Sequence, residues 1–398
     1  MKQKNRPVFV YPSVFAVALY SAVLGYMIPA MRLKFSLSLA AAGLFSTMQS
    51  IGFFIAMLLC FCVFAGLNKP RVMASLQLAF ALCLAGLALA PSLWVLCVLF
   101  LFTGLFANAI DMLSNAVIAD LAPDTKGRHI GLLQALFSAI SAAAPFFALL
   151  LGGDYATVFF GLSALALASL ALFVPGLHTE IRRPMLQCPQ SLGTVRKAMR
   201  LWKVHGVPVA VVISFLALFV QLSLMYFLSS FTADISDAPL AGAFVLCMFY
   251  VGAMVGRLVF VRISRRINAY RIMAVYDALA LAGIAAMLMV NDITVLGLLA
   301  LIPGFGLSAN FPGLMVEACN LVPDDTAAAS ALIFVGVNTA ALAAPPLVGL
   351  MGDSLGLGAA FTVCGALLVP VIALSIWMGR KAQSAACCAD ASASSKEA

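Results

Sequence analysis

The segment Arg71-Val72-Met73-Ala74 returns 200 residues later as Arg271-Ile272-Met273-Ala274, and each copy begins a long apolar stretch. The segment Leu121-Ala122-Pro123-Asp124 returns at the same offset as Leu321-Val322-Pro323-Asp324, each time just after an apolar stretch. A constant offset over this length indicates an internal duplication, which governs the fold of the whole chain. We therefore expect two halves of the same architecture.

The composition excludes an ordinary soluble protein. Hydrophobic residues make up 64% of the 398 residues, charged residues make up 10%, and the mean hydropathy is +1.09. Soluble domains carry about 25% charged residues, so the excess of apolar residues must face lipid. Backbone polar groups have no water partners in hydrocarbon, so spanning segments must be helices or closed barrels. The alternating strands of a barrel are not visible in the sequence.

Twelve stretches are long enough to cross a bilayer, which takes about 20 mostly apolar residues. We predict an all-α membrane protein whose twelve transmembrane helices form two pseudo-symmetric six-helix bundles. The bundles are expected at 1–176 and 207–379, joined by a cytoplasmic linker at 177–206 and followed by a disordered cytoplasmic tail at 380–398. The spans are expected at 8–30, 37–65, 71–91, 93–119, 129–152, 156–176, 207–231, 239–261, 270–290, 293–317, 327–350 and 357–379.

The charged residues of the loops indicate the orientation. Lys and Arg gather in alternate loops, including Lys69 with Arg71 and the group from Arg262 to Arg271. The opposite loops hold only Arg32 and Lys34, against Asp154, Asp234, Asp237, Asp292 and Asp353. The positive-inside rule then places both chain ends and the linker in the cytoplasm of a multi-pass cell-membrane protein. The net charge of +8 reflects this topology, and we expect no nucleic-acid partner.

Residues for catalysis or metal binding form no recognisable pattern in the sequence. The ten Cys are scattered, mostly within apolar stretches, where thiols behave as small apolar side chains. The pair Cys387-Cys388 lies in the Ala/Ser-rich tail, where we expect an inert reduced pair. The sequence shows no nucleophile–base pair, phosphate loop or metal-ligand spacing. We therefore expect no enzyme, no cofactor and no metal.

The loops after the second and eighth stretches resemble a family signature. The first reads Gly66-Leu67-Asn68-Lys69-Pro70-Arg71, and the second reads Val261-Arg262-Ile263-Ser264-Arg265-Arg266-Ile267-Asn268-Ala269-Tyr270-Arg271. Their basic residues and spacing resemble the Gly-x-Leu-Ala-Asp-Arg-x-Gly-Arg loop of the major facilitator superfamily, whose transporters have six plus six helices. Both copies lack the acid, with Ser264 in its place in the second, which leaves the usual charge latch of this loop in question.

Three further segments resemble the fucose-permease-like branch of that superfamily. Asp111-Met112-Leu113-Ser114-Asn115 is similar to its acid-x-x-x-Asn, and Gly252-Ala253-Met254-Val255-Gly256-Arg257 to its Gly-x-x-x-Gly-Arg. Ala344-Pro345-Pro346-Leu347-Val348-Gly349 is similar to its Pro-Pro-x-x-Gly. The resemblance implies two bundles that rock around one central site, and proton-coupled uptake of a sugar or a similar small polar solute.

Asp111 lies about five residues from the middle of its apolar stretch, at a depth where a charge usually faces a cavity or a partner. Asn108, Asp111 and Asn115 project from one face of the fourth helix, which lines the cavity in the superfamily. A low dielectric favours the neutral carboxylic acid, so we expect Asp111 to take up a proton outside and release it inside. The two amides would bind solute hydroxyls. The alternative is an Asp that only packs helices together.

Asn310 in the tenth stretch falls near the repeat position of Asn108, among Pro and Gly residues that permit a bend. A bending half-helix would suit a gate, although helix packing explains the same residues. An amide in a membrane helix is often only a link between helices. With that alternative open, the other candidates for solute contact are Gln49, Gln134, Gln221, Tyr226, Tyr250 and Asn338.

Arg257, Asp277 and Glu317 lie toward the cytoplasmic ends of the eighth, ninth and tenth stretches. A charge at that depth needs a partner. We expect an ion-pair latch that closes the cytoplasmic side when the cavity faces outward. The alternative is a static pair that fixes helix packing.

The function predicted from these features is secondary active transport of a small, sugar-like polar solute by alternating access, with proton symport. The expected partners are the solute, protons and the lipid bilayer, and we expect a monomer. One alternative is an efflux antiporter of drugs or metabolites, but the fifth helix reads Ala143-Ala144-Pro145-Phe146-Phe147 and lacks the Gly-Pro-x-x-Gly-Gly element of that class. The other alternative is a non-transporting sensor or scaffold of the same fold, which would have no use for a polar cavity.

Overall fold

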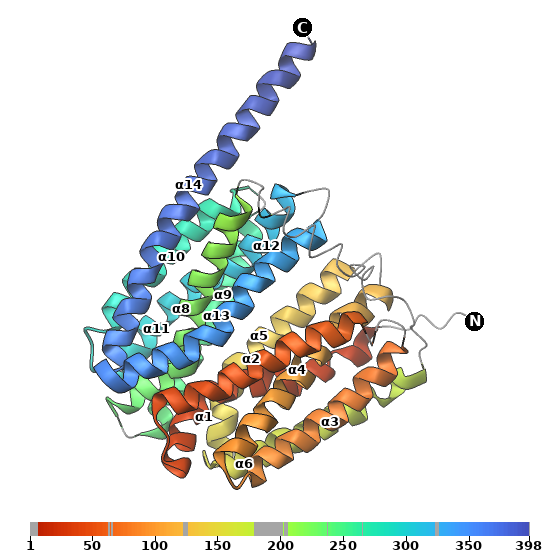
Figure 1. Ribbon diagram of the computed structural model, residues 1–398, viewed down its shortest axis with the longest axis vertical. Helices are drawn as coiled ribbons and strands as arrows, with labels where there is room; N and C mark the ends of the chain where they lie inside the picture. Colours follow the sequence, from red (N-terminus) through yellow and green to blue (C-terminus); the bar gives the residue numbers. More distant parts are fainter. Residues whose placement is uncertain are drawn as a thin grey trace.

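The computed structural model consists of long helices packed as two groups side by side, one from each half of the chain (Figure 1). It describes residues 7–62, 64, 67–121, 126–178, 202, 206–236, 238–264, 266–322 and 326–397. No strand occurs among these residues. The predicted linker therefore lies mostly outside the described residues.

Each half supplies six spans. The first half contains a short 3-10 helix η1 (Pro7–Val10), then α1 (Ser13–Phe35), α2 (Leu39–Cys62), α3 (Lys69–Leu89), α4 (Leu93–Leu121), α5 (Lys126–Leu150), α6 (Tyr155–Phe173) and η3 (Val174–His178). The second half contains α8 (Val207–Ala233), α9 (Pro239–Ile263), α10 (Ala269–Met287), α11 (Ile293–Leu307), α12 (Asn310–Leu321), α13 (Thr326–Leu355) and α14 (Leu357–Glu397).

The apolar lengths of these helices fit a bilayer. Eleven helical stretches among the described residues are long and apolar enough to span one, and α5 adds a shorter apolar stretch, Leu136–Leu150. The tenth predicted span corresponds to α11 and α12 together. The predicted fold class, an all-α membrane protein with twelve spans, is confirmed. Large apolar side chains such as Trp94, Leu82 and Met289 remain exposed on the outside, where lipid would cover them.

Equivalent glycines make equivalent contacts in the two halves. A Cβ added to Gly52 would overlap the carbonyl oxygen of Leu101, and one added to Gly252 would overlap that of Leu301. Only glycine allows the backbones of α2 and α4, or of α9 and α11, to approach so closely. A second set of contacts follows the same 200-residue offset: Gly104 against Gln49, and Gly304 against Phe249. The duplication seen in the sequence is therefore present in the packing.

The two halves meet about an axis that relates them. Gly25 of α1 packs against the carbonyl of Met225 of α8 so closely that a Cβ would overlap it, and these two residues are themselves 200 positions apart. A residue that contacts its own repeat equivalent lies next to the pseudo-twofold axis. Helices α1 and α8 are accordingly the most deeply buried spans.

The spans have two ends, which we name by what lies there. The turn end carries the α1–α2 and α13–α14 connections, and the terminus end carries the start of α1 and the end of α14 (Figure 1). The described basic residues Lys69, Arg71, Arg262 and Arg271 lie at or near the terminus end, at the ends of spans.

Three of the differences from the predicted boundaries have a clear physical cause. Helix α1 begins at Ser13 rather than at residue 8, because Pro12 precedes it and residues Pro7–Val10 form a 3-10 turn. The tenth span is broken at 308–309. Pro312 has no N–H to donate to the Ser308 carbonyl four residues earlier, and this accounts for the break.

The third difference concerns the end of the chain. Helix α14 continues to Glu397, so the backbone is helical where the sequence predicted a disordered tail from residue 380. The segment is rich in Ala, the strongest helix former, which explains the helix.

At the terminus end of each half, an acidic side chain holds the start of one helix against a neighbouring helix. In the first half, Lys69 Nζ lies 2.6 Å from Asp120 Oδ2, which fastens the start of α3 to the end of α4. In the second half, Glu317 Oε1 accepts a hydrogen bond from the backbone N–H of Ala269, 3.0 Å away, which fastens α10 to α12. The acid missing from the first family-like loop is thus supplied by Asp120 from the next helix.

Asp120→Asn should lower the stability of the N-terminal half. Lys69 is only 1% exposed, and the substitution leaves its ammonium group without a counterion, which we expect to cost up to about 3 kcal/mol. Adding Lys69→Met should recover most of the loss, because no charge then remains buried. Thermal unfolding of the two variants in detergent checks this, with the exposed Arg262→Gln as control. Equal midpoints for Asp120→Asn and the wild-type protein would contradict it.

Candidate functional site

The halves are held together at the turn end by Asp353. Its Oδ1 and Oδ2 accept hydrogen bonds from the backbone N–H groups of Leu39 and Ala40, at 2.8 and 2.9 Å. These are free N–H groups of the first turn of α2, where a carboxylate is stabilised by the helix dipole. Asp353 belongs to α13, so this cap joins the second half to the first. The sequence reasoning assigned Asp353 only to a loop.

The contact between α2 and α13 continues inward from this cap. A Cβ on Gly43 would lie 2.5 Å from the carbonyl oxygen of Pro345. Thr47 Oγ1 donates a hydrogen bond to the Leu342 carbonyl at 3.2 Å. Ser50 Oγ donates to the Ala341 carbonyl at 3.1 Å. The Pro-Pro-x-x-Gly segment singled out in the sequence therefore forms a close backbone contact between the halves.

Two opposite charges, one from each half, lie near each other at the turn end. Asp234, at the end of α8, lies near Arg32, at the end of α1. Burial raises the pKa of the Asp234 carboxyl above its ordinary value, and the Arg32 guanidinium opposes this shift. Asp154, by contrast, caps α6 within the first half, and the backbone N–H of Thr157 lowers its pKa.

Asp353→Asn should loosen the closed turn end. The substitution removes a charge and one of two hydrogen bonds to α2, at a cost of roughly 1 kcal/mol, which is about a fivefold larger open population. The rate at which a thiol reagent labels Ser50→Cys checks this, in a background without other reactive cysteines. Asp292→Asn is the matched control, because Asp292 caps α11 within one half by accepting from the Val295 N–H at 2.9 Å. Equal labelling rates for both variants would contradict the prediction.

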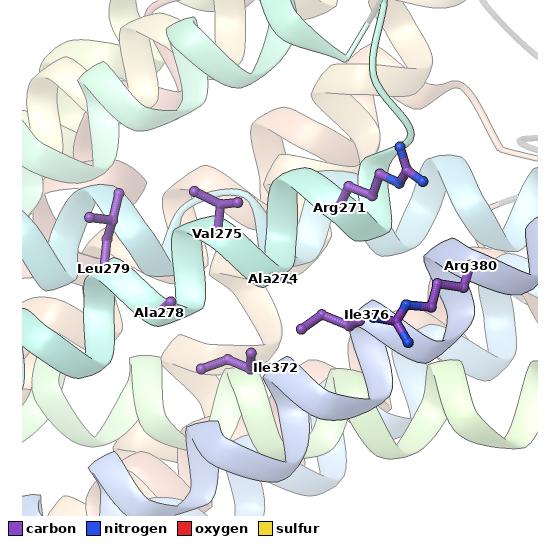
Figure 2. A pocket seen from close by; sticks show the side chains of 8 residues that line it. All are labelled: Arg271, Ala274, Val275, Ala278, Leu279, Ile372, Ile376 and Arg380. Carbon is purple, nitrogen blue, oxygen red and sulfur yellow. The ribbon is translucent and has the colours of Figure 1, made fainter. Parts of the chain in front are cut away.

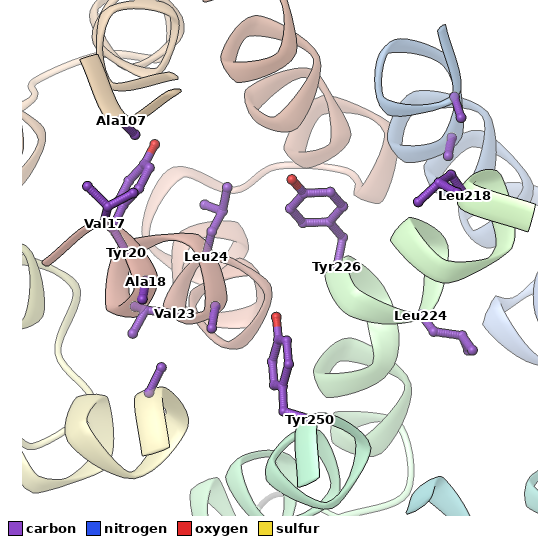
Figure 3. Packing of buried hydrophobic residues seen from close by; sticks show 14 of the residues in the cluster. Val17, Ala18, Tyr20, Val23, Leu24, Ala107, Leu218, Leu224, Tyr226 and Tyr250 are labelled. Atoms are coloured by element: carbon purple, nitrogen blue, oxygen red, sulfur yellow. The ribbon is translucent and has the colours of Figure 1, made fainter. Parts of the chain in front are cut away.

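Midway along the spans, polar groups of α8 and α9 meet the first half. Arg257 Nη1 donates a hydrogen bond to Ser138 Oγ of α5 at 2.7 Å. Tyr250, two turns earlier on α9, is close enough to Arg257 and to Tyr226 to interact with both electrostatically. Figure 3 shows the rings of Tyr226 and Tyr250 extending from α8 and α9 toward α1. Arg257, Ser138, Tyr226 and Tyr250, which we call the central polar cluster, belong to three spans, α5 of the first half and α8 and α9 of the second.

The predicted stripe on α4 lies on the first half. Asn115 Nδ2 donates to the backbone carbonyl of Asp111 at 2.9 Å and to its Oδ1 at 3.4 Å. Asn115 Oδ1 is buried with no hydrogen-bond partner among the described residues. Asn108 Nδ2 donates to the Phe53 carbonyl of α2 at 3.1 Å, so this amide already links two helices. Asp111 and Asn115 are only partly buried. Their contact with a solute stays a prediction.

The remaining predicted contact residues fall into three groups. Gln49 and Gln221 are buried, and Gln49 Oε1 has no hydrogen-bond partner among the described residues. Asn338 is partly buried on α13, at the position that the repeat makes equivalent to Ser138. The side chain of Gln134 lies outside the described ones. Gln49 and Asn338 thus lie on α2 and α13, which pack against each other across the interface, but neither is shown to bind a solute.

Arg257, Asp277 and Glu317 do not contact one another in this structure. Asp277 is fully buried within the second half, where its Oδ1 accepts from Asn310 Nδ2 at 2.8 Å. Glu317 caps α10, as described above, and Arg257 reaches Ser138. Lys69–Asp120 is the ion pair found among the described residues. Asn310, predicted to face the cavity, instead points at α10, and the latch stays a prediction for another conformation.

A groove of about 570 Å³ lies on the outer face of the second half, between α10 and α14 (Figure 2). Its walls are apolar, and Arg271 and Arg380 lie toward its terminus end. Val275 in its wall is 62% exposed, so the groove opens to the surroundings of the bundle. It is separate from the interface between the halves, where the central polar cluster lies. We therefore do not consider it the solute site.

Comparison with known proteins gives a consistent result. The Major Facilitator Superfamily matches residues 10–328. No curated protein matches the sequence. Among solved structures, the nucleoside transporter NupG is 14% identical with a TM-score of 0.77, covering 94% of this chain and 99% of its own. A bacterial homolog of the human lysosomal transporter Spinster, in an inward-facing and occupied conformation, is 14% identical with a TM-score of 0.74, covering 96% and 98%.

Proposed function

The chain belongs to the major facilitator superfamily, and from this premise we propose that it is a secondary active transporter. It moves a small, sugar-like polar solute across the cell membrane together with protons, by alternating access. The observation that carries this proposal is the asymmetry of the interface. Close contacts join the repeated halves from the turn end to the middle, through Asp353, Gly43 and Gly25, as in one conformation of a two-sided cycle.

The orientation follows from the basic residues at the terminus end. Under the positive-inside rule this end faces the cytoplasm, together with both chain termini. The closed turn end then faces outward, and the structure corresponds to a conformation closed to the outside. Separation of the halves at the turn end, with new contacts at the terminus end, would give the opposite conformation.

Asp111 is the residue to which we assign proton coupling. It is a partly buried carboxyl in the middle of a span, and Asn115 is its hydrogen-bond donor. A low dielectric disfavours the charged form of a carboxyl, so the Asp111 side chain can take up and release a proton during the cycle. The sugar-like solute is supported by the three segments that resemble the fucose-permease-like branch and by the hydroxyl and amide groups along the interface.

Reconstitution of the protein in proteoliposomes tests this proposal. We expect labelled monosaccharides, sugar acids or nucleosides to accumulate when the lumen is alkaline, and a protonophore to abolish the accumulation. Uphill movement only in the direction opposite to the proton flux would favour the antiporter. Absence of movement for every solute, with a correctly folded protein, would favour the sensor or scaffold.

A further inference from the structure

Arg257 is a cation with a single hydrogen-bond partner among the residues that the structure describes. A guanidinium group has five N–H donors, and the described partner of Arg257 is one hydroxyl, Ser138 Oγ at 2.7 Å. No carboxylate of a described residue lies within 4.0 Å of it. The acids that the sequence offered as partners, Asp277 and Glu317, are bound to Asn310 and to the Ala269 N–H. The positive charge is thus without a counterion among the residues that the structure describes.

Arg257 lies at the interface between the halves, where the proposed function expects the solute. The side chain bridges α9 and α5, which belong to different halves. Its near neighbour Tyr250 adds a hydroxyl, and Figure 3 shows Tyr250 and Tyr226 directed at the same interface. The two glycines of the same segment have a packing role, since Gly252 and Gly256 let α9 lie close to Leu301 and Phe305 of α11. Packing of this kind leaves the arginine itself unexplained.

We infer that the transported solute carries a carboxylate, and that Arg257 binds it. This inference rests on the proposed transport function and specifies its substrate class as a hydroxylated organic acid, such as a sugar acid. Arg pairs with carboxylates through two parallel N–H···O bonds, and the described residues occupy only one N–H group of Arg257. The hydroxyl groups of Tyr226 and Tyr250 and the amides of the interface suit the remaining hydroxyls of such a solute.

A stability measurement tests the inference without knowledge of the solute. If Arg257 is kept for a ligand, its uncompensated charge destabilises the solute-free protein. Arg257→Met should then leave the thermal unfolding midpoint of the solute-free protein unchanged or raise it. A midpoint several degrees lower would show that the guanidinium holds the helices together, and would overturn the inference. Arg262→Met, at the exposed end of the same helix, is the control.

A binding measurement tests the chemical class. Purified protein is heated with matched pairs that differ by a CH₂OH or a COO⁻ group: glucose and glucuronate, galactose and galacturonate, glycerol and glycerate. Only a ligand of the folded form raises the midpoint. We expect acids but not their neutral partners to stabilise the wild-type protein, with at least about tenfold weaker binding to Arg257→Met and an intermediate value for Arg257→Lys.

Two results would overturn the inference. One is stabilisation by a neutral sugar that Arg257→Met retains, and the other is failure of every acid of the panel to stabilise the wild-type protein. Proteoliposome uptake separates this failure from failure of the proposed function. Suppose a neutral solute accumulates with the proton gradient and Arg257→Met does not affect its uptake. The proposed transport function would then stand, and the inference that the solute carries a carboxylate would be wrong.

Discussion

Asp111→Asn abolishes accumulation of the solute against its gradient and leaves exchange of the solute across the membrane intact. An amide has no ionisable proton, so movement of the solute is no longer tied to the proton gradient. The carbonyl oxygen of the new Asn can still accept the hydrogen bond that Asn115 donates to Asp111. The local structure should therefore persist, and the accumulation ratio should fall to about one because the proton no longer contributes free energy.

The measurement compares two modes of transport in the same vesicles. Uptake driven by a pH gradient should disappear, whereas counterflow of labelled against unlabelled solute should continue. Asp292→Asn removes one carboxylate from the turn end, where Asp292 caps α11, and should affect neither mode. Undiminished uphill uptake by Asp111→Asn would show that the proton is carried elsewhere.

Gly43→Val prevents the turn end from closing and stops the transport cycle. A single Cβ at this position lies 2.5 Å from the Pro345 carbonyl oxygen, and Val adds two more carbons. The backbones of α2 and α13 must then move apart. About 5.5 kcal/mol inverts a 99:1 equilibrium between two conformations, and an overlap with backbone atoms costs energy of this order. The chain still folds, because the halves are apart at this end in the opposite conformation.

Two substitutions distinguish this effect from loss of folding. Gly358→Val adds the same side chain at the start of α14, where the nearest atom would be 4.0 Å from the Cβ, and should retain transport. Gly52→Val adds it where α2 and α4 of the same half touch, and should lower the yield of folded protein. We expect Gly43→Val to be folded and inactive, with Ser50→Cys labelled rapidly from outside. Full activity of Gly43→Val would contradict the closed turn end.

The repeat predicted the fold because it links positions that must have the same surroundings. Gly52 and Gly252 contact Leu101 and Leu301, so one comparison of the sequence with itself accounts for two helix packings. The start of α9 was predicted well, because Pro239 marks it. The end of α1 was predicted too early, at residue 30, whereas the helix continues to Phe35 and ends before Ser36, which has a left-handed conformation with φ 51°.

The contacts between the halves could not be predicted in the same way. The hydrogen bond of Arg257 joins residues 119 positions apart, and that of Asp353 to Leu39 joins residues 314 positions apart. Both depend on how far one bundle is shifted against the other, which no local pattern records. The sequence therefore identified Arg257 as unusual but assigned it acids of its own half, whereas the structure gives it a hydroxyl of the other.

The candidate site shows the same division. Helical spacing correctly places Asp111 and Asn115 close together on α4, because the pair lies one turn apart. Asn310 was given a place in the cavity because it falls near the repeat position of Asn108, whereas the structure shows its amide bound to Asp277. The tenth span is broken just before Asn310 and the fourth is continuous, so the repeat position alone does not give the surroundings of this residue.

Distances across the two ends of the bundle test alternating access most directly. Spin labels at Leu33 and Leu355, both exposed at the turn end, report one opening, and labels at Leu67 and Ile267, both exposed near the terminus end, report the other. We expect acid and solute to change the two distances in opposite directions, one lengthening as the other shortens. Distances that change together, or only one that changes, would contradict it.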